Sequence, residues 1–147
     1  MAVFRRLPGP MRRAVVHAAT PSFTAGAVAV LRRDDGRIAF VEQRHTPGWG
    51  LPGGLMERGE SPEQCLLREL VEELGVVVDP ASLPLPFAAV NAGVRRVDVV
   101  YFIDAPPGVR LRTEDEIEVS RTGWFSLDAL PELNEPTVDI LRAVRVL

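Results

Sequence analysis

Glu69, Glu72 and Glu73 stand at positions i, i+3 and i+4, which places their side chains on one face if the segment is helical. Like charges at this spacing destabilise an isolated helix by about 0.2–0.5 kcal/mol per pair. A divalent cation such as Mg²⁺ would offset that repulsion, because it prefers oxygen ligands and suits clustered carboxylates that face a phosphate-bearing substrate. From these residues alone, a solvated acidic face on which Arg68 pairs with Glu72 is the alternative.

The segment around these glutamates has the start and stop signals of one amphipathic helix. Ser61 is a candidate N-cap, Pro62 suits the first turn, and Gln64 completes a capping box. Gly75 suits the C-terminal end. Another side of the helix is apolar, because four leucines gather there: Leu66, Leu67, Leu70 and Leu74. The helix therefore presents carboxylates on one face and a core-forming surface on another.

The whole stretch from Gly54 to Val76 reads GLMERGESPEQCLLRELVEELGV. Gly54, five residues, Glu60, seven residues and then the run from Arg68 to Val76 resemble the Nudix box, and no position of that signature departs from it. The resemblance to Nudix hydrolases implies a loop–helix–loop that holds Mg²⁺ or Mn²⁺ against a diphosphate. The substrate that it implies is a nucleoside diphosphate linked to another group.

The same resemblance implies a role for each polar residue of the box. The family's metal ligands and base match three glutamates and one backbone carbonyl, namely Glu69, Glu72, Glu73 and the carbonyl of Gly54. Arg68 and Glu60 match the pair that braces the loop against the helix. This bracing has a physical motive, because a guanidinium that forks onto a carboxylate fixes the loop geometry that a metal site needs.

Downstream, the segment EVSRTGWFSLDALP resembles the Nudix ending in which a glutamate six residues before the tryptophan is a further metal ligand or the general base. Glu118 holds that position relative to Trp124. Glu114 and Glu116 remain alternatives, since all three glutamates share one face of a strand, and plain surface charge is a further reading. In hydrolysis of the diphosphate, water attacks phosphorus, and either Glu69 or Glu118 is expected to accept the proton of that water.

Three arginines are candidates for contact with substrate phosphate, with simple exposure to solvent as the alternative: Arg44, Arg95 and Arg96. Residues 91–94 lack the proline and the tyrosine that are typical of relatives specific for ADP-ribose and for diadenosine polyphosphates, which favours a nucleoside triphosphate or an oxidised nucleotide. Two other functional classes are alternatives to a nucleotide hydrolase. One is a non-catalytic nucleotide-sensing module, which need not retain the carboxylates. The other is an RNA 5′-end pyrophosphohydrolase, which needs a basic groove.

Composition indicates the number of domains, the binding partners and the cellular location to expect. The chain has 147 residues, enough for one domain, and its formal net charge of −3 gives no general attraction to nucleic acid or to an anionic membrane. Its one cysteine cannot form an intrachain disulfide, and no apolar run approaches the ~20 residues that cross a bilayer, so a cytoplasmic protein is expected. Residues 1–20 are expected to form an extension, helical over 11–19, that caps the domain or reaches a partner subunit in a homodimer.

The elements that position these residues are expected within 21–147. Apolar runs predict strands over 23–31 and 37–43, joined by an Asp-Gly turn, and over 87–90 and 97–104. Shorter strands are expected over 76–78 and 114–118, an irregular loop over 46–54, and helical segments over 126–130 and 136–146. Strands before and after the central helix, with a closing helix, predict an α/β fold, a Nudix-type α/β/α sandwich with a central mixed sheet.

Overall fold

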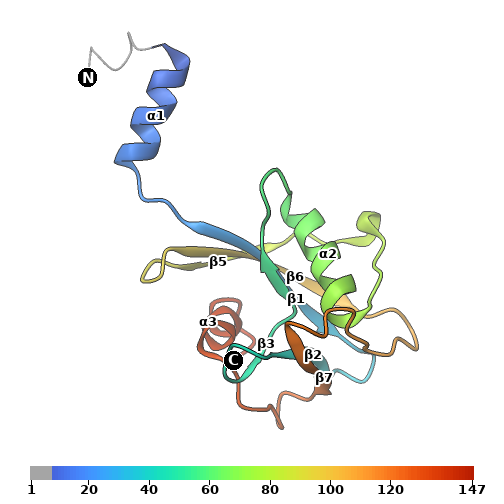
Figure 1. The fold of residues 1–147 in the computed structure, drawn as a ribbon. Helices are drawn as coiled ribbons and strands as arrows, with labels where there is room; N and C mark the ends of the chain where they lie inside the picture. Colours follow the sequence, from blue (N-terminus) through green and yellow to red (C-terminus); the bar gives the residue numbers. More distant parts are fainter. Residues whose placement is uncertain (1–7) are drawn as a thin grey trace.

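A computed structural model describes residues 8–147 of the chain, and this part forms one mixed sheet with helices on both faces (Figure 1). The strands are β1 (Thr24–Arg32), β2 (Ile38–Gln43), β3 (Trp49–Gly50), β4 (Gly53–Leu55), β5 (Phe87–Asn91), β6 (Arg96–Asp104) and β7 (Val119–Phe125). The helices are α1 (Gly9–Ala19), α2 (Pro62–Leu74) and α3 (Glu135–Ala143), with a 3-10 turn, η2 (Pro80–Ser82).

The two long central strands, β1 and β6, run parallel, in register from Thr24 opposite Arg96 to Arg32 opposite Asp104. The remaining pairs are antiparallel, in the path β3-β2-β1-β6-β5, while β4 pairs with β1 and β7 with β2. The predicted turn between β1 and β2 is present, with Gly36 at a φ of 82°. The sheet is therefore mixed, as expected.

Alternate residues of the central strands point into two separate cores. On the α2 side, Ala27 and Leu31 of β1 pack with Leu66, Leu70 and Tyr101. On the other side, the α3 side, the buried residues include Val28, Val30, Phe40, Val100 and Leu141. Burial on both faces explains why β1 reads as a nearly continuous apolar run. The predicted α/β/α sandwich is confirmed.

Three predictions about short elements are wrong, of which the strand expected over 114–118 is described with the active site. The glycine-rich segment 46–54 is not wholly irregular, because it contains β3 and the start of β4. Residues 76–78 form no strand, since Gly75 ends α2 in the left-handed conformation and the Val76 N–H donates to the Leu70 carbonyl. The Val76 side chain then turns into the α2-side core.

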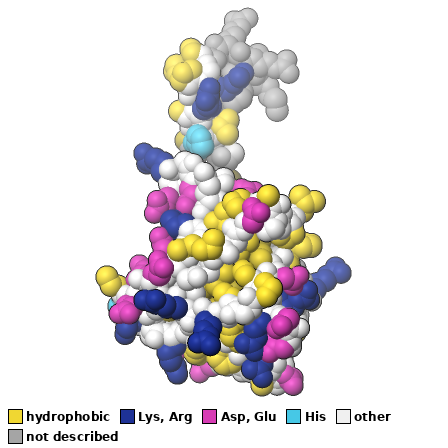
Figure 2. All heavy atoms as spheres, turned by 90° about the vertical axis from the view of Figure 1, so that its right-hand side faces the viewer, with side chains coloured by type: hydrophobic (Ala, Val, Ile, Leu, Met, Phe, Trp, Pro, Cys, Tyr) yellow, Lys and Arg dark blue, Asp and Glu magenta, His cyan; other side chains and the backbone are white. Residues whose placement is uncertain are grey.

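Helix α1 begins at Gly9 and stands away from the rest of the molecule (Figures 1 and 2). None of its residues is buried, so the described part of the expected extension, residues 8–20, does not cap the domain. Its contact with a partner subunit stays a prediction, and residues 1–7 of the expected extension lie outside the described part. No helix within residues 8–147 is long and apolar enough to cross a membrane.

Candidate active site

Helix α2 carries the candidate carboxylates, and its start is fixed by the predicted capping box. The Ser61 hydroxyl accepts from the Gln64 N–H at 3.2 Å, and the Gln64 side chain accepts from the Ser61 N–H at 2.9 Å. Gly75 closes the helix with a φ of 64°. Because both ends are set by local sequence, the register of the carboxylates on α2 follows directly from their spacing.

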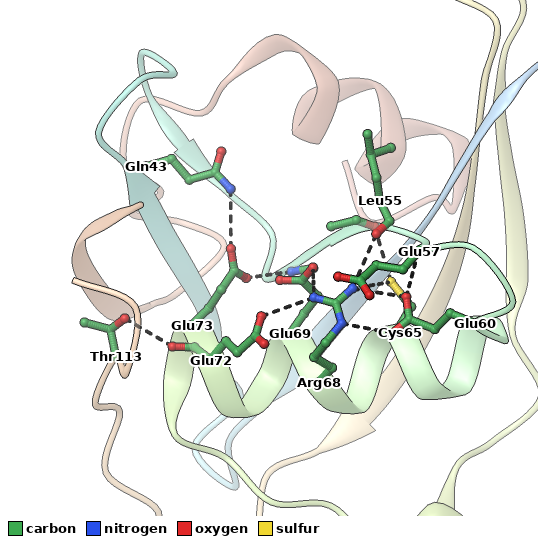
Figure 3. Close-up of polar contacts among 12 residues, drawn as sticks. Gln43, Leu55, Glu57, Glu60, Cys65, Arg68, Glu69, Glu72, Glu73 and Thr113 are labelled. Carbon is green, nitrogen blue, oxygen red and sulfur yellow. Dashed lines mark hydrogen bonds and ion pairs between the residues drawn. The ribbon is translucent and has the colours of Figure 1, made fainter. Parts of the chain in front are cut away.

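Arg68 is the central cation of this site (Figure 3). Its Nε and Nη2 donate to the two oxygens of Glu60 at 2.9 and 3.1 Å, so the expected pair between loop and helix is present. Its Nη1 donates to Glu69 at 2.7 Å and to Glu72 at 3.1 Å. The hydrogen bond from Arg68 holds the pKa of Glu60 at about 2, so this carboxylate stays ionised and the loop stays tied to α2.

Glu73 is buried, with 5% of its surface exposed, although the helical pattern predicts a solvent-facing side chain. One carboxylate oxygen accepts from the Gly53 N–H at 2.7 Å and the other from the Gln43 side chain at 3.3 Å (Figure 3). Burial, with the negative charges of Glu69 and Glu118 nearby, raises the pKa of Glu73 to about 8. Burial also raises the pKa of Glu69.

Glycines let the loop approach the carboxylates closely. A Cβ at Gly54 would lie 2.3 Å from a Glu69 oxygen, and a Cβ at Gly26 would lie 2.8 Å from the Gly54 carbonyl. Gly26 therefore serves the close approach of the loop. The Cys65 thiol donates to the Gly54 carbonyl at 3.6 Å, and burial raises the pKa of this packed thiol to about 11.

A cavity of about 410 Å³ brings most of the candidate residues together. Gly54, Glu69, Glu73 and Glu118 line it, with Arg96 on another wall. Glu72 is not among the lining residues, and its carboxylate accepts from Arg68 Nη1 at 3.1 Å, beside Glu69. The other two arginines proposed from the sequence are also absent from the lining. Arg44 donates to the Glu116 carbonyl at 3.0 Å, and Arg95 is an exposed residue at the β5–β6 turn with a φ of 51°.

Glu118 reaches this cavity from a turn and not from the expected strand over 114–118. The Asp115 carboxylate accepts from the N–H groups of Ile117 and Glu118, both at 3.0 Å, and so bends the chain before β7 begins. The same segment is tied to α2, because the Glu114 N–H donates to the Glu72 carbonyl at 2.8 Å. Neither Glu114 nor Glu116 lines the cavity.

The donor set suits a hard divalent cation. Gly54 and three carboxylates line one cavity, where burial and, to a lesser extent, the neighbouring carboxylates raise the pKa values of Glu69 and Glu73. Glycine at 54 also leaves room that a Cβ would fill. Within residues 8–147, however, no three carboxylate, histidine or cysteine side chains already stand at metal-binding distances. Arg68 binds only one oxygen of Glu69, so the other oxygen is available to a cation.

Several residues of the cavity were not expected from the sequence. Gln43 binds Glu73, and Asn134 and Thr137 line the wall formed by the start of α3. The start of α3 could have been recognised in the sequence, because Asn134 is a favourable N-cap residue. Its side chain accepts from the N–H of Thr137, at position N3, at 3.0 Å. Nothing local in the sequence indicated that the start of α3 lines the same cavity as the carboxylates of α2.

Comparison with known proteins gives consistent matches. The family model described as NUDIX domain matches residues 22–144. The MutT-like protein of Streptomyces ambofaciens is 29% identical over 112 residues, which are 76% of this chain and 70% of that protein. The NAD-capped RNA hydrolase NudC of Pseudomonas aeruginosa is 32% identical over 77% of this chain, which spans only 40% of NudC. A crystal structure of a MutT NUDIX hydrolase from Burkholderia pseudomallei superposes with a TM-score of 0.68 at 33% identity, covering 84% of this chain and 99% of that one.

Proposed function

Because the chain belongs to the NUDIX family and is a Nudix hydrolase, we propose that it cleaves the diphosphate linkage of a nucleoside diphosphate joined to another group, in a reaction that depends on Mg²⁺ or Mn²⁺. Nucleoside triphosphates and oxidised nucleotides are the preferred candidates. The observation that carries this proposal is the one cavity that Gly54, Glu69, Glu73 and Glu118 line together.

The residues that would hold the cation are those of this cavity wall, namely Gly54, Glu69, Glu73 and Glu118. When bound there, the cation neutralises charge on the diphosphate and lowers the pKa of a bound water. Glu72 stays a further predicted ligand, since it lies one turn from Glu69 on α2 and shares Arg68 Nη1 with it. Arg68 is assigned as the brace that fixes Glu69 relative to the loop.

The chain supplies the proton acceptor from the same wall. Either Glu69 or Glu118 accepts the proton of the water that attacks phosphorus, which contributes roughly 10² to 10⁴ in rate. Burial raises the pKa of Glu69, which brings its basicity closer to the neutral range where a general base works best. Glu118 is the more exposed of the two and is carried by a turn.

On the substrate side, Arg96 is the only one of the three candidate arginines among the residues that line the cavity. We therefore propose substrate binding for Arg96, while phosphate contact by Arg44 and Arg95 stays a prediction. The expected partner is a small nucleotide. A cytoplasmic location and a homodimer stay predictions.

A substrate panel tests the proposal. Purified protein is assayed with nucleoside triphosphates, 8-oxo-dGTP, ADP-ribose and NADH, each with Mg²⁺, with Mn²⁺ and with EDTA, and the products are separated by ion-exchange chromatography. We expect cleavage at a phosphoanhydride of at least one compound, dependent on the metal. Binding without turnover of any compound would instead indicate a nucleotide-sensing module.

A second candidate is hydrolysis at an RNA 5′ end, favoured by the 32% identity to NudC. Against it, arginine and acidic side chains are interspersed on the face in Figure 2, which offers no continuous basic surface there. Adding a 5′-NAD-capped and a 5′-triphosphate RNA to the panel distinguishes the two. A rate on RNA well above that on free nucleotides would favour the second candidate.

A further inference from the structure

Asp98 is a buried carboxylate outside the set of proposed metal ligands, with 4% of its surface exposed. Its position in an alternating strand predicts a polar face, yet this face of β6 lies under α3 and carries Val100 and Phe102 into the core. The partner of Asp98 is Arg96, two residues earlier on the same face. Arg96 Nε donates to both carboxylate oxygens at 2.9 and 2.8 Å, and Nη2 donates to one of them at 2.8 Å.

This side-on pairing uses only one edge of the guanidinium. Within residues 8–147, every hydrogen bond that the Arg96 side chain donates comes from Nε or Nη2, so the Nη1 group keeps both of its N–H donors for another partner. The side chain of Arg96 is 29% exposed. A charged donor that is fixed in direction and left unpaired is suited to ligand recognition.

Arg96 lies on the boundary of two cavities. One is the carboxylate cavity described above, and the other, of about 350 Å³, lies between the β5–β6 hairpin and α3. Pro136 and Ile140 of α3 line both as well. The second cavity is mostly apolar, with Ala89, Val90, Val94 and Ala143 among its lining residues. A substrate with its diphosphate in the first cavity thus has room for its remaining part in the second.

The charges around the second cavity disfavour phosphate. Asp98, Glu135 and Asp139 line it, and Arg96 is the only cation among its lining residues. The charge of Arg96 is already balanced by the buried Asp98 at 2.8 Å. Its long-range attraction for an anion is therefore weak, while its directional hydrogen bonds remain available.

We propose that Arg96 is the specificity-determining residue that donates hydrogen bonds to a neutral acceptor on the nucleoside part of the substrate, and that Asp98 is the residue that positions it. This inference rests on the proposed function and differs from the expectation that Arg96 contacts phosphate. Gly26 contributes space, because a Cβ there would lie 2.6 Å from an Asp98 oxygen and 3.3 Å from Arg96 Nη2.

The experiment compares two ligands that each contain half of a substrate. Nucleoside 5′-monophosphates (AMP, GMP, CMP and UMP) report on the nucleoside side and are titrated calorimetrically in EDTA, without turnover. Methylenediphosphonate with Mg²⁺ has no nucleoside and reports on the metal side. The variants are Arg96→Lys, which keeps the charge, and Arg96→Gln combined with Asp98→Asn, which replaces the buried ion pair by two amides.

Both variants should weaken the tightest-binding monophosphate about tenfold or more, because lysine lacks the planar fork, and should change methylenediphosphonate binding less than about twofold. Asp98→Asn alone frees the charge of Arg96, so it should weaken the monophosphate and tighten methylenediphosphonate. Asp104→Asn is the matched control, because Asp104 pairs with Arg32 at an exposed position on the same strand, and it should change neither ligand.

Two results would overturn the inference. If Arg96→Lys binds both ligands as the wild type does while the double variant loses methylenediphosphonate, Arg96 acts as a phosphate-binding charge. If the melting temperature falls but monophosphate binding is unchanged, the pair is only structural. Absence of turnover on the substrate panel would refute the proposed function instead, and the monophosphate titrations would still decide the role of Arg96.

Discussion

Replacement of Glu73 by glutamine should make the metal-free protein more stable and the enzyme inactive. Glu73 is 5% exposed and accepts hydrogen bonds from the Gly53 N–H and the Gln43 side chain, while Glu69 and Glu118 add negative charge to its surroundings. Without a cation, an ionised carboxylate in this position is unfavourable. Glutamine keeps the shape and an acceptor oxygen but cannot ionise.

The magnitude follows from the pKa of Glu73, which burial raises from 4.5 to about 8. An acid with a raised pKa binds its proton more tightly in the folded state, so the stability that it contributes is present below pH 4.5 and is lost as the pH rises towards 8. The loss is about 1.4 kcal/mol per pH unit, which gives about 3 kcal/mol at pH 7 and less than about 1 kcal/mol at pH 5. For a chain of this size, the gain at pH 7 corresponds to about 6–12 °C in melting temperature.

The assay is thermal unfolding of both proteins in EDTA at pH 5 and pH 7, repeated with saturating Mg²⁺, together with the rate on the best panel substrate. With Mg²⁺ the order of stability should reverse, because the wild type binds the cation more tightly in the folded state. The rate of Glu73→Gln should fall about 10²-fold or more, which is about 2.7 kcal/mol. Glu63→Gln is the control on the same helix: hydrogen bonds from its own backbone N–H and from Ser61 lower the pKa of Glu63, so its loss should not stabilise. A stability gain of Glu73→Gln that is equal at pH 5 and pH 7 would refute the buried-charge reasoning.

Arg68→Lys should lower the melting temperature and weaken Mg²⁺ binding together with the rate, since lysine cannot make the fork seen at 2.9 and 3.1 Å; an unchanged melting temperature with only KM raised would show a substrate ligand instead. Gly54→Ala should lower kcat about 10²-fold in an assay at saturating substrate, because the added Cβ would lie 2.3 Å from a Glu69 oxygen and displace that carboxylate. Near-normal turnover would contradict this close approach. Glu118→Gln should reduce kcat by about 10²-fold or more while Glu116→Gln, outside the cavity, changes it less than about twofold; equal effects would return both to the solvated surface.

Local signals made helix α2 predictable. Ser61, Gln64 and Gly75 act through hydrogen bonds within a few residues, so the helix bounds could be read from the chain. The same reasoning failed over 76–78 for a local reason, because the Val76 N–H completes the helix end and is unavailable to a sheet. The strand prediction over 114–118 failed because the Asp115 carboxylate accepts from the N–H groups of Ile117 and Glu118. These hydrogen bonds favour a turn over an extended strand.

Burial of polar residues could not be predicted in this way, because it is decided by distant elements. The helical pattern places Glu73 with Glu69 and Glu72, but whether a member of that face is solvated depends on the approach of β2 and of the Gly53 N–H. Asp98 is the same case on a strand, since alternation identifies its face but not the helix α3 that covers it.

This difference also explains why the sequence indicates the reaction more readily than the substrate. The residues for cleavage are held by one helix and the loop before it, in a spacing that is fixed along the chain, and so they form a recognisable signature. The second cavity, by contrast, is built from β1, the β5–β6 hairpin and α3, which meet only in the folded protein. In the sequence, its polar residues Arg96 and Asp98 fit the alternating pattern of an ordinary strand. Their pairing beside α3 becomes apparent only in the structure. Substitutions at Arg96 and in the wall of the second cavity should therefore change which substrate is preferred, even when the residues of α2 are unchanged. We expect such substitutions to act mainly on KM, and substitutions in α2 to act mainly on kcat.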